Sequence, residues 1–182
     1  DYVSIGDLDL PGSFTVSMWA KANNLGSDCH GSAVMKRYDY GFELCSGIMY
    51  GQIGKGTGPG WAASTSYTVP QSGVWNYYTL TYDGSTAKLY VDANQVSTAT
   101  GTHTTNDIPL LFGSWDTSSE FFNGTIDEVR IYKRVLNQAE ITADMNTPIG
   151  GTPPPLDTTP PQVLITFPPN NAQVSDIVTV TA

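Results

Sequence analysis

The sequence predicts an all-β protein, a two-sheet sandwich of the jelly-roll kind with a β-strand extension at the C-terminal end. Short segments rich in β-branched and aromatic residues recur along the chain, separated by turn dipeptides such as Asp83-Gly84 and Asn123-Gly124. The composition agrees, with 18 Gly, 12 Pro and 10 Tyr but only 14% charged residues. This combination is typical of folds in which many short strands are joined by tight turns.

The strands can be placed in order along the chain. The first strong strand alternates, with Phe14, Val16, Met18 and Ala20 on one face and Thr15, Ser17 and Trp19 on the other. Ala33–Arg37 and Tyr40–Cys45 are predicted to be the two arms of a hairpin across Tyr38-Asp39. Further strands are predicted at Trp75–Tyr82, Lys88–Val91, Val96–Thr100 and Leu110–Gly113.

The segment Phe122–Ile141 predicts a turn, a strand and one short helix. Ile126–Tyr132 has the composition of a strand. Asn137 stands three residues before Glu140, the spacing of a capping box, in which each side chain satisfies a free N–H at the start of a helix.

Six pieces of the sequence carry a family resemblance: Asp1-Tyr-Val with Ile5, Ser13–Trp19, Gly73–Tyr77, Thr81–Ser85, Lys88–Asp92 and the segment Phe122–Ile141. In this order they resemble the concanavalin A-like, laminin G-like jelly rolls of secreted bacterial proteins, and we place that domain at residues 1–148. The resemblance implies a fold that binds sugars far more often than it catalyses a reaction. Members of that family usually open with a further strand before the Tyr-Val pair, and this sequence has no counterpart of it.

The last part of the sequence is predicted to be organised differently. Residues 149–161 form a Pro-rich linker, and residues 162–182 resemble the start of a bacterial immunoglobulin-like domain. Such a domain needs about seven strands, whereas this segment offers two, so it cannot bury a core alone. Either the segment is part of a larger domain, or Val163–Thr181 adds as a donor strand to an open sheet edge in the same or a neighbouring subunit.

The charge balance limits the class of partner. Eight basic and 17 acidic residues give a formal net charge of −9, which argues against nucleic acid because phosphate binding needs clustered Lys and Arg. The sequence also has no apolar run long enough to insert into a membrane. We therefore expect a secreted or cell-surface protein whose partner is a neutral glycan or a cell-surface polysaccharide.

The two cysteines, Cys29 and Cys45, are predicted to form a disulfide. The hairpin pairing puts Cys29 a few residues from the strand partner of Cys45, so a bond requires the chain to bend there. The alternative is two buried free thiols, and the secreted character of the chain favours the disulfide.

Catalysis is not expected. Related jelly-roll glucanases carry two glutamates flanking an aspartate on one strand, and Thr125–Glu128 lacks the first glutamate of that pattern. The two histidines, His30 and His103, lie in loop-like contexts without a nucleophile beside them. We predict that the chain is not an enzyme, and at most an accessory domain of a secreted one.

A structural calcium ion is implied by the resemblance, since family members often hold one near the segment that contains Asp127. The matching residues are Asp127 and Asp1. Calcium takes six to eight oxygen ligands, so two carboxylates do not complete a site. The alternative for Asp127 is that it caps a turn or pairs with Arg130.

The predicted ligand site consists of aromatic residues in loops. Sugar binding needs an aromatic ring that stacks on the apolar face of a pyranose, together with polar groups that take its hydroxyls. Trp61 and Trp115 are flanked by Gly- and Ser-rich loops, with Tyr38, Tyr40 and Asp116 as companions, while Trp19 and Trp75 are expected in the core. The alternative is that Trp61 and Trp115 cover a sheet edge or a protein interface.

These observations predict a non-catalytic, extracellular carbohydrate-binding or adhesion module. The alternative function is a structural subunit of an extracellular filament or surface assembly, held together by donor-strand exchange of Val163–Thr181.

Overall fold

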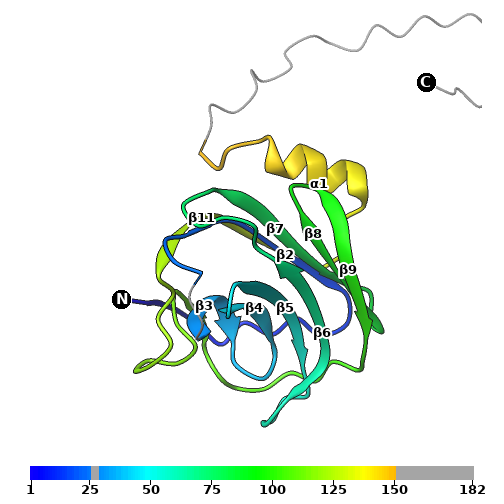
Figure 1. Cartoon of the computed structure of the whole chain (residues 1–182). Coiled ribbons are helices and arrows are strands. Elements are labelled where there is room, and N and C mark those ends of the chain that lie inside the picture. Colours follow the sequence, from blue (N-terminus) through cyan, green and yellow to red (C-terminus); the bar gives the residue numbers. More distant parts are fainter. Residues whose placement is uncertain (26–28, 151–182) are drawn as a thin grey trace, which may run out of the picture. The chain divides into compact units, whose positions relative to one another are not determined.

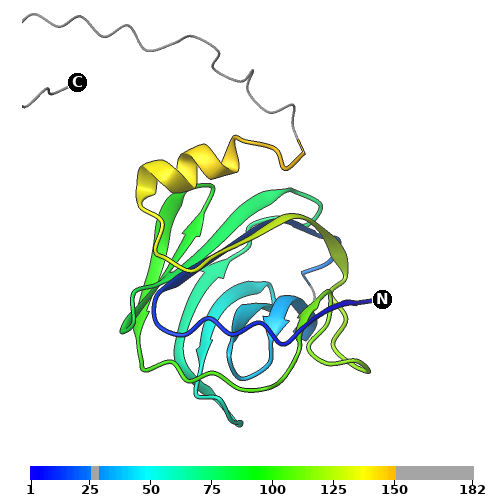
Figure 2. The same cartoon turned by 180° about the vertical axis from the view of Figure 1, so that it is seen from behind.

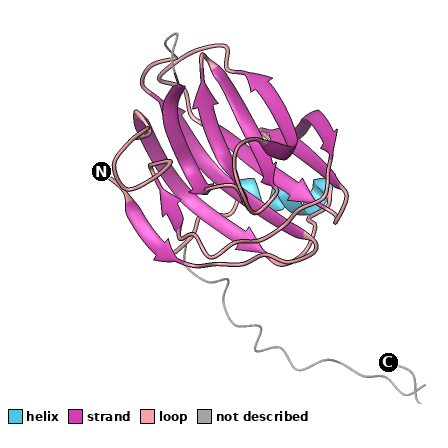
Figure 3. Ribbon diagram, turned by 90° about the horizontal axis from the view of Figure 1, so that it is seen from below, coloured by secondary structure: helices cyan, strands magenta, loops and turns pink. Residues whose placement is uncertain are grey.

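The computed structural model describes residues 1–25 and 29–150, and nearly all of its regular structure is strand (Figure 3). In chain order the strands are β1 (Val3–Gly6), β2 (Phe14–Ala22), β3 (Cys29–Lys36), β4 (Tyr40–Cys45), β5 (Ile48–Gly54), β6 (Trp61–Thr68), β7 (Asn76–Tyr82), β8 (Thr86–Val91), β9 (Asn94–Thr100), β10 (Leu110–Phe112) and β11 (Gly124–Tyr132), followed by helix α1 (Gln138–Met145).

Two antiparallel sheets pack face to face (Figures 1 and 2). One has six strands in the order β1-β10-β3-β4-β5-β6, and the other has five in the order β11-β2-β7-β8-β9. Strands distant in sequence are neighbours in both sheets, because β10 pairs with β1 and β3 while β11 pairs with β2. The sequence-predicted all-β, two-sheet class is confirmed.

The core lies between the sheets and follows the alternation read from the sequence. In β2 the predicted inner face is confirmed, since its four residues Phe14, Val16, Met18 and Ala20 all lie in the main hydrophobic cluster. From β7, Tyr78, Leu80 and Tyr82 enter the same cluster. The side chain of Tyr77 points to the opposite face of the sheet, where it is also fully buried. This burial requires a cover on the outer face, which α1 provides.

Helix α1 covers the outer face of the five-stranded sheet (Figure 1). The predicted capping box is present, with Asn137 accepting from the Glu140 N–H and Glu140 accepting from the Asn137 N–H. At the other end of the helix, Asp144 accepts hydrogen bonds from Tyr77 (2.7 Å) and Tyr132 (2.6 Å). The helix is therefore fixed to the sheet by a polar anchor as well as by its apolar face.

A fully buried lysine joins three segments of the chain. The Lys36 ammonium lies 2.7 Å from Asp7, 2.7 Å from Asp9 and 3.0 Å from the buried carboxylate of Asp39. It also donates to the carbonyl of Asn106. Burial alone would lower the pKa of Lys36, but the hydrogen bonds to the three carboxylates outweigh it and raise the pKa above its usual range, so the side chain is a cation.

The predicted hairpin of Ala33–Arg37 and Tyr40–Cys45 is present as β3 and β4, with Lys36 opposite Tyr40 and Arg37 in the turn. Two register shifts in β3 then place Cys29 directly opposite Cys45. Residues directly opposite in an antiparallel pair have Cα atoms about 4.5–5.5 Å apart, within the range of a disulfide. The bend that the bond requires is thus provided by these two irregularities, and the disulfide stays a prediction.

The predicted linker and tail fall almost entirely outside the described residues, which reach Gly150. The same holds for the immunoglobulin-like resemblance of residues 162–182. Within the described ranges, no helix is long and apolar enough to cross a membrane.

Replacing Lys36 by Met should leave the buried Asp39 carboxylate without the lysine ammonium, with only the His103 ring and the Asn106 N–H as partners. Removing one partner of a buried ion pair typically costs about 3–5 kcal/mol, so we expect a loss of that size in the free energy of unfolding measured with urea. The matched control is Lys133→Met, an exposed lysine, for which we expect a change within about 0.5 kcal/mol. Equal stability of the two variants would contradict the structural role of Lys36.

If Cys29 and Cys45 are bonded, the denatured protein should show no titratable thiol until a reductant is added. Reduction should then lower the free energy of unfolding by about 3 kcal/mol, the loop-closure value for a loop of about 15 residues. Two thiols titrating in freshly purified, unreduced protein would contradict the bond.

Candidate functional site

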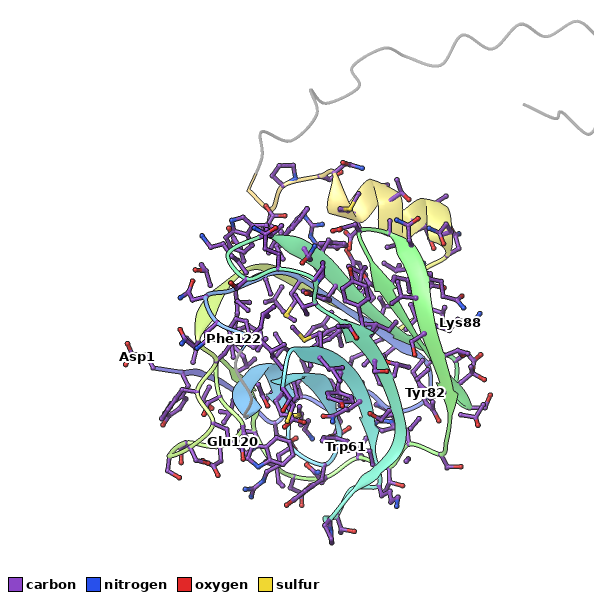
Figure 4. All side chains as sticks on the ribbon, in the orientation of Figure 1. Asp1, Trp61, Tyr82, Lys88, Glu120 and Phe122 are labelled. Carbon is purple, nitrogen blue, oxygen red and sulfur yellow. The ribbon has the colours of Figure 1, made fainter. Side chains whose placement is uncertain are left out.

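A turn, the start of a strand and a loop bring Tyr38, Trp61 and Trp115 into one aromatic cluster. Tyr38 lies in the β3–β4 turn, Trp61 is the first residue of β6, and Trp115 lies in the loop between β10 and β11. The Trp115 ring packs edge to face against Tyr38, with ring centroids 5.7 Å apart, and against Trp61, with ring centroids 5.8 Å apart. All three side chains are half-buried, and Figure 4 shows Trp61 at the end of the sandwich remote from α1.

Two glycines allow the chain to close around Tyr38. Tyr38 has a φ of 62°, the left-handed conformation that a tight turn requires. A Cβ at Gly54 would lie 1.8 Å from the Tyr38 carbonyl oxygen, and one at Gly58 would lie 2.4 Å from its ring. Only glycine therefore permits the loop between β5 and β6 to lie against this residue.

The carboxylate of Asp116 is held in place beside the cluster. Its Oδ1 accepts from the N–H groups of Ser118 (2.8 Å) and Ser119 (2.7 Å), and from both serine hydroxyls at 3.0 Å. These bonds, the Ser118 N–H first among them, lower the pKa of Asp116 to about 2. Asp116 is therefore an ionised acceptor over the whole physiological pH range, and its loop is ordered by short local bonds.

Arg37 is a member of the site that the sequence prediction missed. Its guanidinium lies 5.3 Å from the centre of the Tyr38 ring and 3.7 Å from Asp116 Oδ2. In the described part of the structure, its buried Nε has no hydrogen-bond partner. Arg37 and Asp116 also line a cavity of about 200 Å³, with Trp115, Leu111 and Pro109 on its apolar side. No distinctive sequence pattern marks Arg37, which is a single basic residue next to Tyr38 in a turn.

Tyr40 does not belong to this site, and its prediction as a ligand contact was wrong. The side chain is fully buried in the main core, where its hydroxyl donates to the Leu8 carbonyl at 2.8 Å. The physical reason is strand parity, because Tyr40 shares a face of β4 with Phe42 and Leu44, both of which are core residues.

The cluster has the parts of a sugar-binding surface. Aromatic rings present apolar faces to the C–H groups of a pyranose, while Asp116 accepts from hydroxyls and Arg37 donates to them. An ionised acceptor and a cationic donor side by side suit a pair of neighbouring hydroxyls. The residues come from a turn, a strand end and a loop, so the strands of the sandwich determine their positions.

A second polar group lies under the same β10–β11 loop. Glu43 accepts from Gln52 at 3.0 Å, and it stands opposite Ser32 in the β3–β4 register. Burial raises the pKa of Glu43, and the negative charge of Glu120 raises it further, against the lowering effect of the Gln52 hydrogen bond. The sequence did not indicate that Glu43 and Glu120 would interact, because they are far apart in the chain.

The two predicted calcium ligands line one cleft but do not form a complete site. Asp1 and Asp127, together with Glu128, line a cleft of about 580 Å³ between the edges of the two sheets. Within the described ranges, no group of three or more Asp, Glu, His or Cys side chains is placed to hold a metal. The Arg130 guanidinium lies 3.0 Å from Glu128 and 3.0 Å from Asp144, and it pairs with these two carboxylates rather than with Asp127.

Trp19 and Trp75 were both expected in the core, and only Trp19 packs in that way. Its ring lies 5.3 Å from Tyr77 in the cluster beneath α1. Trp75 is 38% exposed, and the Lys21 ammonium lies 5.2 Å from the centre of its ring. Both tryptophans line a cleft of about 500 Å³ with Asp127, Glu128, Met145, Asn146 and Pro148.

Comparisons with solved structures agree with this architecture. A mutant of HCR/D superimposes with a TM-score of 0.62 at 14% identity, over 79% of this chain and 39% of that one. The receptor binding domain of the botulinum neurotoxin C/D mosaic serotype superimposes with a TM-score of 0.61 at 14% identity, over 74% of this chain and 36% of that one. The binding domain of Paraclostridial Mosquitocidal Protein 1 superimposes with a TM-score of 0.57 at 16% identity, over 80% of this chain and 40% of that one. At these identities the likeness shows the fold, and it spans about two fifths of those chains at most.

Sequence comparison provides the assignment. No curated protein matches the sequence. The profile of one family, described as the concanavalin A-like lectin/glucanases superfamily, matches residues 1–142, which include all of the described strands and most of α1. The match agrees with the two antiparallel sheets and with the structural neighbours, and the chain therefore belongs to the concanavalin A-like lectin/glucanases superfamily.

Proposed function

We propose that residues 1–148 form a non-catalytic carbohydrate-binding or adhesion module of a secreted or cell-surface bacterial protein. The observation that supports this most strongly is the convergence of Tyr38, Trp61 and Trp115, which come from three separate segments of the chain. A purely structural role would favour burying these rings completely, whereas all three keep part of their surface in solvent.

In the proposed mechanism a pyranose stacks on the exposed face of Trp61 or Trp115, and its hydroxyls bond to Asp116 and Arg37. The net charge of −9 favours a neutral glycan over a polyanion. One structural neighbour is the receptor binding domain of a botulinum neurotoxin, and another is a botulinum neurotoxin binding domain in complex with rat synaptotagmin II. In those toxins, domains of this fold therefore bind a receptor.

Calcium enters the proposal as a structural ion at the cleft of Asp1 and Asp127, without contact to the sugar. These carboxylates would hold it together with backbone carbonyls and water, since the described side chains alone provide too few oxygens.

A second candidate is a structural subunit that assembles through Val163–Thr181. Those residues lie outside the described ranges. This candidate is supported by a possible acceptor site, because β1 and β11 are edge strands that flank one cleft.

Trp61→Ala and Trp115→Ala should each weaken glycan binding at least about tenfold, equal to about 1.4 kcal/mol, because each removes a stacking surface. Binding would be measured on a glycan array and then by calorimetry with the best ligand. The matched control is Trp75→Ala, which removes an exposed tryptophan remote from the cluster and should leave the affinity unchanged. Urea unfolding of each variant separates lost binding from lost structure. Full affinity in the double variant would refute the site.

Adding calcium at about 100 times its dissociation constant should raise the free energy of unfolding by about 2.7 kcal/mol, if the ion binds the folded state alone. The gain should vanish in Asp127→Asn, while the affinity for glycan at 25 °C stays the same. Identical melting curves in calcium and in a chelator would contradict the proposed structural calcium ion.

A further inference from the structure

The edge strand β11 has a cleft on each of its two faces. On the core side, the cleft of about 580 Å³ is lined by Ile126 and Val129, with Val3 and Phe112 across from them. On the α1 side, the cleft of about 500 Å³ is lined by Trp19, Trp75 and Met145. Asp127 and Glu128 line both clefts, so the two meet at β11.

The two clefts can accommodate the side chains of one additional strand beside β11. Successive side chains of a strand point to opposite faces of the sheet, so a strand beside β11 would send alternate side chains into the two clefts. Among the described strands, β11 pairs with β2 alone, and its other edge faces no strand. Apolar side chains at the cleft are unusually exposed, with Val3 at 59% and Ile149 at 57%. Exposed apolar surface next to a free edge favours strand addition.

We propose that the segment Val163–Phe167 of a second copy docks on β11 as a sixth strand of the five-stranded sheet. The inference rests on the second candidate function and specifies its acceptor. Val163, Ile165 and Phe167 would enter the core-side cleft, and Leu164 would face Trp19 and Trp75.

The absence of acidic side chains in the segment makes it compatible with the charge of the clefts. The carboxylates in the walls of the two clefts are those of Asp1, Asp127 and Glu128, and Glu128 is already paired with Arg130 at 3.0 Å. A strand with acidic residues would be repelled, whereas residues 158–175 of this sequence carry no charged side chain.

The linker favours a neighbouring copy over the same chain. Residues 153–155 and 160–161 are prolines, and a Pro-rich segment extends by about 3.1 Å per residue. A stiff linker that leaves the domain beside this cleft resists the reversal of direction that docking within the same chain requires, so a neighbouring copy is the favoured acceptor.

The test uses the full chain in three forms, followed by size-exclusion chromatography with light scattering. The donor variant Ile165→Asp places a charge in the docking segment. The acceptor variant carries Val3→Asp and Ile149→Asp, two exposed positions at which folding should be unaffected. The control, Val96→Asp, changes a residue that is 40% exposed on β9, the opposite edge of the same sheet.

We expect the unmodified chain and the Val96→Asp control to form oligomers, and the donor and acceptor variants to be monomeric. When the two monomeric variants are mixed, one intact segment meets one intact cleft, so a species of twice the single-chain mass should form and go no further.

An acceptor variant that still assembles, when Ile165→Asp does not, would overturn this site while leaving assembly through the tail in place. A monomeric unmodified chain would overturn both the site and the assembly. Monomers that persist in the mixture would show that the segment does not dock on β11 of another copy.

Discussion

The structure of the candidate site depends on the buried cation of Lys36. Arg37 and Tyr38 lie in the turn between Lys36 and Asp39, whose side chains form a buried ion pair at 3.0 Å. The Asp39 carbonyl accepts from Gly54, and the Arg37 carbonyl accepts from the Asn106 side chain. The ion pair therefore fixes both ends of the turn that presents the aromatic and basic side chains.

Much of the fold followed from patterns that the sequence displays directly. The alternation of Phe14–Ala20 and the spacing of Asn137 and Glu140 reflect local geometry, and both were confirmed. The two register shifts in β3 could not be predicted, because they depend on the β10–β11 loop pairing with Ser32 rather than on residues nearby in sequence. They decide where Cys29 lies relative to Cys45.

The candidate site was predictable in part. Trp61 and Trp115 stood out because loops give a large apolar side chain no core to enter, and the structure brings them together. Tyr40 was misjudged because the prediction gave more weight to its closeness in sequence to Tyr38 than to its alternation with Phe42 and Leu44, which places it in the core. Arg37 was missed because a single basic residue in a turn has no distinctive pattern. Its significance comes from tertiary contacts with Tyr38 and Asp116.

The central claim is that the buried ion pair holds the aromatic cluster in place. Nuclear Overhauser contacts between the ring protons of Trp115 and those of Tyr38 and Trp61 test it most directly. We predict strong contacts in the unmodified protein and their loss in Lys36→Met, while those between Trp19 and Tyr77, which pack 5.3 Å apart on the other sheet, remain. Unchanged contacts within the cluster in Lys36→Met would contradict the account.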